Sequence, residues 1–136
     1  MPRIPIPPRF LRYAAFVGVV GVVVYFSLLD TPAPPGPTGP WYDKQLHFAS
    51  YAAVTVTAAG ASIEYRNRRW RRIAGVVAFS MAFGVAIELA QWPLVGRYAS
   101  VGDVAANAAG TLLGSVTFAV EDAFGYVDDP AEEARG

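Results

Sequence analysis

The chain has 136 residues, of which 54% are hydrophobic and 16% charged, whereas about 25% of an average soluble domain is charged. Its formal net charge is zero, so bulk charge indicates no nucleic-acid partner. The sequence contains no cysteine, which excludes disulfides and thiolate metal sites. The hydrophobic residues gather in blocks of about 20, the length that spans a bilayer. The composition therefore predicts an all-α, polytopic membrane protein.

Four transmembrane helices are predicted, at about residues 11–29, 44–63, 73–91 and 103–120. They form one membrane domain, residues 13–120, between a basic N-terminal segment, residues 1–12, and an acidic tail. A cleaved signal peptide is an alternative for the first helix, but its apolar stretch exceeds the usual core of about 7–15 residues. The tail, residues 121–136, carries six of the eleven acids and is expected to be flexible.

A segment dense in proline and glycine, residues 30–40, joins the first two helices. Proline removes a backbone donor and fixes φ, so this segment cannot continue a helix. It is expected to form an extended spacer outside the membrane.

The distribution of basic residues predicts the orientation, because lysine and arginine concentrate in short cytoplasmic loops. Nine of the eleven basic residues lie in the N-terminal segment, the 64–72 loop and the tail, which leaves only Lys44 and Arg97 for the other side. The chain is therefore predicted to be a multi-pass protein of the cell membrane with both termini inside (N-in/C-in). The arginine-rich loop either only determines this topology or also binds anionic lipid headgroups.

Ten polar residues are predicted to form one binding pocket at the outer end of the bundle. They are Asp43, Lys44, His47, Tyr51, Glu88, Gln91, Arg97, Ser100, Asp103 and Asn107. The spacing of Asp43, His47 and Tyr51 places them on one face of the second helix, and Glu88 and Gln91 share a face of the third. Polar residues at this depth are costly in lipid, so their convergence indicates a function.

Small residues continue the polar stripe along the fourth helix. Asp103, Asn107, Gly110 and Gly114 recur at helical spacing and share one face. Gly110 and Gly114 would let a neighbouring helix approach closely. A second copy of the chain is one candidate for that neighbour.

The predicted pocket contains both cations and carboxylates. Lys44 and Arg97 are suited to binding phosphate. The carboxylates of Asp43, Glu88 and Asp103 cannot all remain ionised close together, away from water, unless each has a partner. We therefore expect ion pairs, with Lys44–Glu88 and Arg97–Asp103 as the first candidates.

His47, the only histidine, could act as an acid or base with Glu88 or Asp103, so these three are the candidate catalytic residues. The same polar residues could instead be helix caps, cations reaching the interface or interhelical hydrogen-bonding groups. His47 with the carboxylates could also hold a hard cation. The spacing has no specific ligand signature, so no metal and no cofactor is predicted.

The order and spacing of the polar residues resemble the pattern of a known family. The pattern in this chain comprises Asp43-Lys44-x-x-His47-Phe48-x-x-Tyr51, then Glu88-x-x-Gln91, Arg97, Ser100, Asp103, Asn107, Gly110 and Gly114. This pattern resembles that of the VanZ-like membrane proteins. The resemblance implies a small multi-helix membrane protein linked to teicoplanin (glycopeptide) resistance, and it assigns no catalytic residue.

Three functions are compatible with these observations. The first is a membrane protein whose outward-facing pocket binds the headgroup of an anionic lipid or of a lipid-linked envelope precursor. The second is a small membrane enzyme that acts on a lipid-linked substrate. The third is a structural partner subunit, in which the polar residues only fix the helix registry.

Overall fold

The computed structural model describes residues 3–30, 36–37, 39, 41–94 and 100–127. Arg97, one of the predicted binding residues, lies outside the described residues, as do residues 128–136 of the tail and most of the proline-rich segment. The described part is helical apart from short connections and two strands of two residues each.

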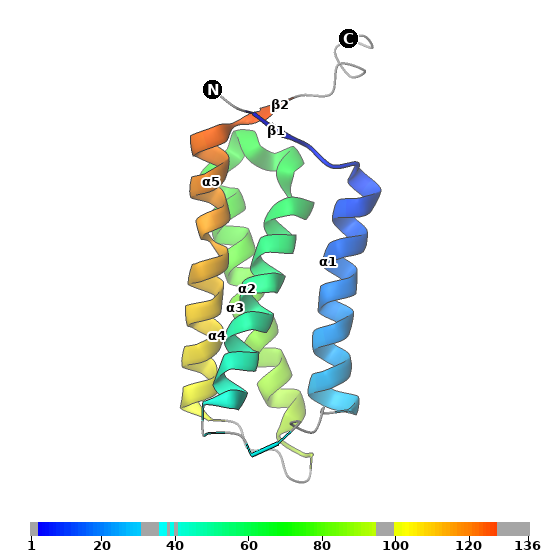
Figure 1. The fold of residues 1–136 in the computed structure, drawn as a ribbon, viewed down its shortest axis with the longest axis vertical. Coiled ribbons are helices and arrows are strands. Elements are labelled where there is room, and N and C mark those ends of the chain that lie inside the picture. Colours follow the sequence, from blue (N-terminus) through cyan, green and yellow to red (C-terminus); the bar gives the residue numbers. More distant parts are fainter. Residues whose placement is uncertain (1–2, 31–35, 38, 40, 95–99, 128–136) are drawn as a thin grey trace.

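The helices form four columns that run alternately down and up in Figure 1. They comprise α1 (Arg9–Val24) with its π-helical extension η1 (Tyr25–Leu29), α2 (Tyr42–Ala61), the 3-10 helix η2 (Ile63–Arg68), α3 (Arg69–Gln91), α4 (Val101–Gly114) and α5 (Val116–Phe124). The all-helical prediction is confirmed, and the predicted helix ends differ from these by at most four residues. The arginine-rich 64–72 segment is itself helical, since arginine is a good helix former.

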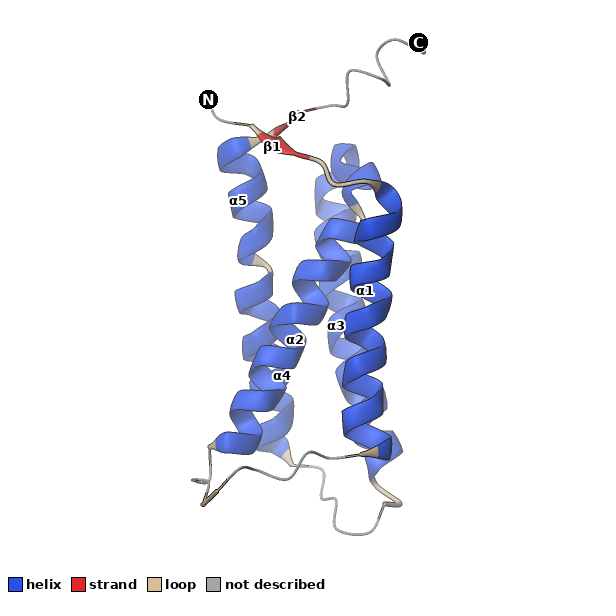
Figure 2. Ribbon diagram, turned by 45° about the vertical axis from the view of Figure 1, so that its right-hand side comes forward, coloured by secondary structure: helices blue, strands red, loops and turns tan. Residues whose placement is uncertain are grey.

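The fourth column is interrupted between α4 and α5, where Figure 2 shows a short break in the helix. Ser115 lies at this break and its hydroxyl donates to the carbonyl of Thr111 at 2.8 Å, a bond that often bends helices. α5 then continues to Phe124 and ends at Gly125, whose φ of 68° suits glycine. The first four residues of the predicted flexible tail are thus helical.

A two-residue parallel pairing closes the upper end of the bundle. β1 (Ile4–Pro5) pairs with β2 (Tyr126–Val127), and Figure 1 shows both strands above the helices. The N-terminal segment and the end of α5 therefore lie at the same end of the molecule. Burial and the hydrogen bond to Glu121 raise the pKa of the Tyr126 phenol above its usual range, so its hydroxyl stays protonated and donates even at alkaline pH.

α2 lies between the other columns and contacts α1, α3, α4 and α5. Its closest neighbour is α4. A Cβ added to Gly110 would lie 2.2 Å from the carbonyl oxygen of Phe48, and one added to Gly114 would lie 2.7 Å from that of Ala52. The predicted close approach at the two glycines is confirmed, and its partner is α2 of the same chain. An oligomer would therefore have to use another face.

Ion pairs fasten the arginine-rich end. The guanidinium of Arg72 is buried, donates to both carboxylate oxygens of Glu121 at 2.6 and 2.8 Å, and lies 5.0 Å from the ring centroid of Phe118. Arg12 on α1 bonds the Glu64 carboxylate at 2.6 Å. These pairs join α1 to η2 and α3 to α5, so the acid at position 121 is part of the packed bundle.

Three helical segments are long and apolar enough to cross a membrane: Arg9–Leu29, Ile63–Gln91 and Val101–Phe124. Within the described part of the chain, α2 is not among them. Its first two turns contain Asp43, Lys44 and His47, which lower its mean hydropathy. The structure thus supports three of the four predicted crossings by length and composition.

Candidate functional site

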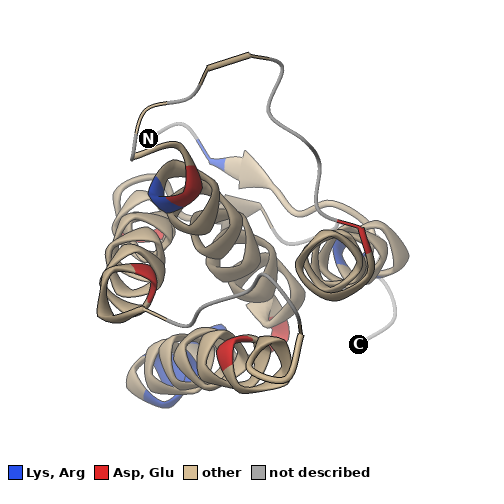
Figure 3. Cartoon of the chain, turned by 90° about the horizontal axis from the view of Figure 1, so that it is seen from below, with Lys and Arg blue, Asp and Glu red and all other residues tan. Residues whose placement is uncertain are grey.

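The predicted pocket residues converge at the lower end of the bundle in Figure 1, where α2 begins, α3 ends and α4 begins. Figure 3, viewed from this end, shows the columns side by side with acidic positions on several of them. The structure brings together eight of the ten residues in the polar cluster, which we define as Asp43, Lys44, His47, Tyr51, Glu88, Ser100, Asp103 and Asn107.

Lys44 joins α2 to α4. Its ammonium group donates to Asp103 Oδ1 and lies 3.3 Å from Ser100 Oγ and 3.4 Å from Asp43 Oδ2. The expected Lys44–Glu88 pair is therefore wrong. Asp103 lies in the first turn of α4, which begins two residues earlier than predicted, and its side chain meets Lys44 of α2. Ser100 is its N-cap and accepts from the Asp103 backbone N–H at 3.1 Å.

His47 lies between the three helices. Its Nδ1 is 2.9 Å from Asn107 Oδ1. A carboxamide oxygen only accepts hydrogen bonds, so Nδ1 carries the proton in this contact. Nε2 then faces two carboxylates, with Asp43 Oδ1 at 3.8 Å and Asp103 Oδ1 at 3.9 Å.

Glu88 approaches the cluster from α3. Its Oε1 lies 3.7 Å from His47 Nδ1, and the residue is only 6% exposed. Among the described residues, no group donates a hydrogen bond to this oxygen. A buried carboxylate oxygen without a donor is unusual, so Glu88 is not explained as a helix cap.

The contacts of Tyr51 and Gln91 are mainly with residues that pack the helices together. Tyr51 is 2% exposed, its ring centroid is 6.0 Å from that of Phe83, and its hydroxyl has no hydrogen-bond partner among the described residues. Gly84 leaves room for this ring, since an added Cβ would lie 3.1 Å from Tyr51 Cε1. Gln91 Nε2 donates to the Ser27 carbonyl at 2.9 Å, which ties α3 to η1.

A pocket of about 260 Å³ lies beside the cluster, between the α1 column, α2 and α3. Its polar wall includes Asp43, His47 and Gln91, and its apolar wall includes Val22 and Phe26 of the α1 column. The sequence analysis treated the first helix only as a membrane span and missed this contribution. A continuous apolar run has no polar stripe to mark which face meets the cluster.

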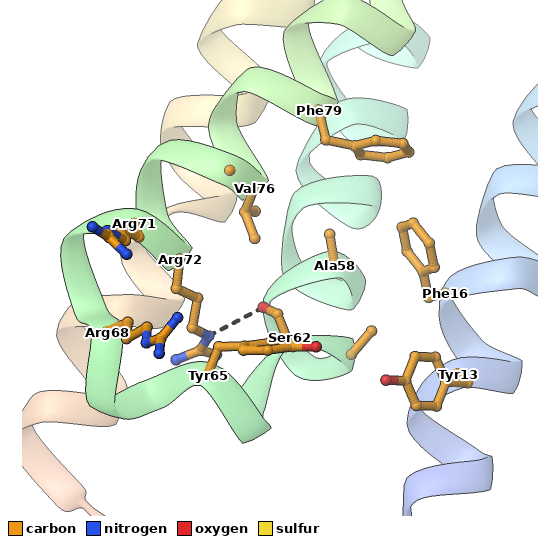
Figure 4. Close-up of a pocket in the computed structure, with 12 residues that line it drawn as sticks. Tyr13, Phe16, Ala58, Ser62, Tyr65, Arg68, Arg71, Arg72, Val76 and Phe79 are labelled. Carbon is orange, nitrogen blue, oxygen red and sulfur yellow. Dashed lines mark hydrogen bonds between the residues drawn. The ribbon is translucent and has the colours of Figure 1, made fainter.

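A second pocket, of about 480 Å³, lies toward the arginine-rich end. Figure 4 shows Phe16 of α1 and Phe79 of α3 on one side of it, with ring centroids 5.4 Å apart. Arg68 and Arg71 also line it, and neither forms an ion pair with any described residue, unlike Arg72. Sequence reasoning identified the arginines but not the aromatic groove beside them.

The fold and the cluster define a class, an all-helical membrane protein with a buried polar cluster at one end of its bundle. The VanZ/LLP1 family model matches residues 13–121. The chain belongs to this family, which confirms the resemblance found in the sequence. No curated protein and no solved structure matches the chain.

Proposed function

We propose that the chain crosses the cell membrane four times, with both ends on the cytoplasmic side and the polar cluster at the outer end. α2 has 20 residues and, at about 1.5 Å per residue, matches a hydrocarbon core of about 30 Å. In its polar first turns Lys44 and His47 are partly buried against the neighbouring helices, whereas Asp43 is exposed at the end of the bundle, so only part of this polar surface would meet lipid. The arginine-rich segment and the basic N-terminal segment, which the β1–β2 pairing places at the same end, support a cytoplasmic assignment for that end.

Reporter fusions test this topology. Fusions to residue 3 and to residue 127 should report a cytoplasmic location, and a reporter inserted at Gly36 should report an external one. An external signal at residue 127 would contradict the outward-facing cluster, because α4 and α5 form one column.

We propose further that the cluster and its adjacent pocket bind the headgroup of an anionic lipid or of a lipid-linked envelope precursor. The observation that carries this proposal is the mixed lining of the pocket, in which apolar residues such as Val22 and Phe26 of the α1 column lie together with the polar residues Asp43, His47 and Gln91. Such a lining suits an amphipathic ligand. Lys44, whose ammonium lies 3.4 Å from Asp43 Oδ2 at the edge of this pocket, would supply positive charge to the anionic group, and the N-terminal end of α2 would favour an anion as well.

Mass spectrometry of co-purifying lipid tests headgroup binding. Wild-type protein should retain an enriched anionic lipid, and Lys44→Ala or Arg97→Ala should lose it. Arg71→Ala is the matched control, because it removes a cation at the opposite pocket. Equal retention of the same lipid by the wild type, Lys44→Ala and Arg97→Ala would contradict the proposal.

A membrane enzyme is the second candidate function. It is favoured by one contact set, His47 with Glu88 Oε1 at 3.7 Å and Asp103 Oδ1 at 3.9 Å, which places an imidazole between two carboxylates as acid–base chemistry requires. Family membership also leads us to propose a link to glycopeptide resistance. Teicoplanin susceptibility of cells that express the wild type or Lys44→Ala tests that link.

A further inference from the structure

Three potential ligand atoms of the polar cluster lie together. One oxygen of Asp43, one ring nitrogen of His47 and one oxygen of Asp103 are all within 4.8 Å of one another. The two distances from His47 Nε2, to Asp43 Oδ1 and Asp103 Oδ1, are 3.8 and 3.9 Å. These are too long for hydrogen bonds. Two ligands that are each about 2.1 Å from a shared ion lie roughly 3–4 Å apart, which is close to the observed spacing.

The orientation of His47 is that of a ligand. Its Nδ1 donates to Asn107 Oδ1 at 2.9 Å, so Nε2, on the side of the two aspartates, is the nitrogen that can serve as a ligand. Histidines that bind metals commonly donate the other ring N–H to a carbonyl or carboxylate, which fixes the tautomer. Asn107 on α4 supplies that partner here.

Glu88 provides an independent observation. Its side chain is more than nine-tenths buried, and Oε1 lies 3.7 Å from His47 Nδ1, the ring nitrogen that bonds Asn107, without a hydrogen-bond donor among the described residues. The described cluster then contains three carboxylates, of Asp43, Glu88 and Asp103, against the single ammonium of Lys44. Glu88 and Asp103 are buried, whereas Asp43 is exposed; buried carboxylates need compensating charge, and one lysine leaves an acidic excess.

Lys44 occupies the same carboxylates. Its ammonium bonds Asp103 Oδ1 and lies 3.4 Å from Asp43 Oδ2, so an ion at the three donors would compete with it. The lysine stem is flexible and the side chain is partly exposed, which allows the ammonium to move aside. Competition of this kind has a consequence that a plain ion-pair network does not share: removing the ammonium should strengthen cation binding.

We propose that Asp43, His47 and Asp103 bind a divalent cation, with the Glu88 carboxylate as a further acidic group beside it. Two carboxylates with one imidazole suit Mn²⁺ or Zn²⁺. The site goes beyond headgroup binding, because it is built from protein donors alone. A bound cation would also add the positive charge that an anionic phosphate needs in this acidic cluster.

Titration of Mn²⁺ into metal-free, full-length protein in a neutral detergent tests the site without lipid. Electron paramagnetic resonance measures free Mn²⁺, and we expect saturable binding of one ion per chain. Asp103→Asn and His47→Gln should each weaken binding by about tenfold or more, whereas Lys44→Met should strengthen it. Asp122→Asn is the matched control at the opposite end and should bind as the wild type does.

Two results would overturn the proposal. One is the absence of saturable binding in both the wild type and Lys44→Met, provided that both elute as folded protein on size exclusion. The other is wild-type affinity in Asp103→Asn and His47→Gln. A gain of affinity in Lys44→Met cannot result from misfolding, so this variant separates loss of the site from loss of the fold. Failure here with lipid still retained would leave headgroup binding standing.

Discussion

Lys44 on α2 bonds Asp103 on α4, although the two residues are 59 positions apart in the chain. The Asp103 side chain is 6% exposed and that of Lys44 is 29% exposed, so the pair lies at the edge of the packed bundle. Asp103 shares its helix face with Gly110, which meets the backbone of α2 further along. The ion pair and the glycine contact therefore hold the same two helices together at two heights.

The coupling between Lys44 and Asp103 predicts a non-additive double mutant. Asp103→Asn should lower the free energy of unfolding by about 1–3 kcal/mol, because a charged hydrogen bond is lost. Lys44→Met in that background should cost less than it does alone. Circular dichroism can monitor unfolding in detergent for the wild type, the two single mutants and the double mutant. Strictly additive effects would show that the pair contributes nothing to stability.

The glycine contacts predict a position-dependent effect of a single methyl group. Gly110→Ala places a Cβ within 2.2 Å of the Phe48 carbonyl oxygen, so α2 and α4 must separate, and we expect a loss of about 1–3 kcal/mol. Gly75→Ala on α3 is the control, since its Cβ would meet nothing within 4 Å. That change should be neutral or stabilise by up to about 1 kcal/mol. Equal melting temperatures for the two variants would refute the close packing.

The buried pair at the other end predicts a large cost for removing either partner. Arg72→Met removes the two hydrogen bonds that the Glu121 carboxylate accepts from Arg72 and leaves only the one from Tyr126, and we expect a loss of about 3–5 kcal/mol. Glu121→Gln should act in the same direction. Arg71→Met, the neighbouring exposed arginine, should leave the melting temperature unchanged. A flexible tail beginning at residue 121 would instead make Glu121→Gln neutral.

The two candidate functions predict different patterns of loss. Headgroup binding requires the cations, so Lys44→Ala and Arg97→Ala should abolish the teicoplanin phenotype or lipid retention, whereas Glu88→Gln, at a residue that does not line the pocket, should leave it intact. Acid–base catalysis requires the opposite sensitivity, because His47 and Glu88 would transfer the proton. Protein abundance in the membrane is measured for each variant. Losses that follow abundance alone would favour a purely structural role.

Sequence reasoning located the cluster because the location of the cluster depends only on how far each residue lies along its helix. Consecutive helices alternate in direction, so the start of α2, the end of α3 and the start of α4 meet at one end whatever their packing. It could not assign partners. Lys44 could reach any of three carboxylates, and the rotation of each helix decides which one lies nearest. The expected Lys44–Glu88 pair was wrong for that reason.

Glu121 also shows that the sequence alone could not assign ion-pair partners. Here a residue predicted to lie in a flexible tail forms a buried ion pair. A glutamate at this position could belong to a solvated tail or to a packed helix. The neighbouring sequence alone did not distinguish the two. Only the closure of α5 onto α3 placed Glu121 on Arg72. The apolar wall from Val22 and Phe26 likewise depends on how α1 faces α2 and α3.

The sequence by itself determined the helices, their order and the end at which the polar residues gather, since hydrophobic length and helical period are local properties of the chain. The tertiary structure alone decided which charges pair, which face of α1 lines the pocket and how three donors come within reach of one cation. Those outcomes depend on distances between helices, and side chains a few ångströms apart are set by helix rotation and backbone approach rather than by spacing along the chain.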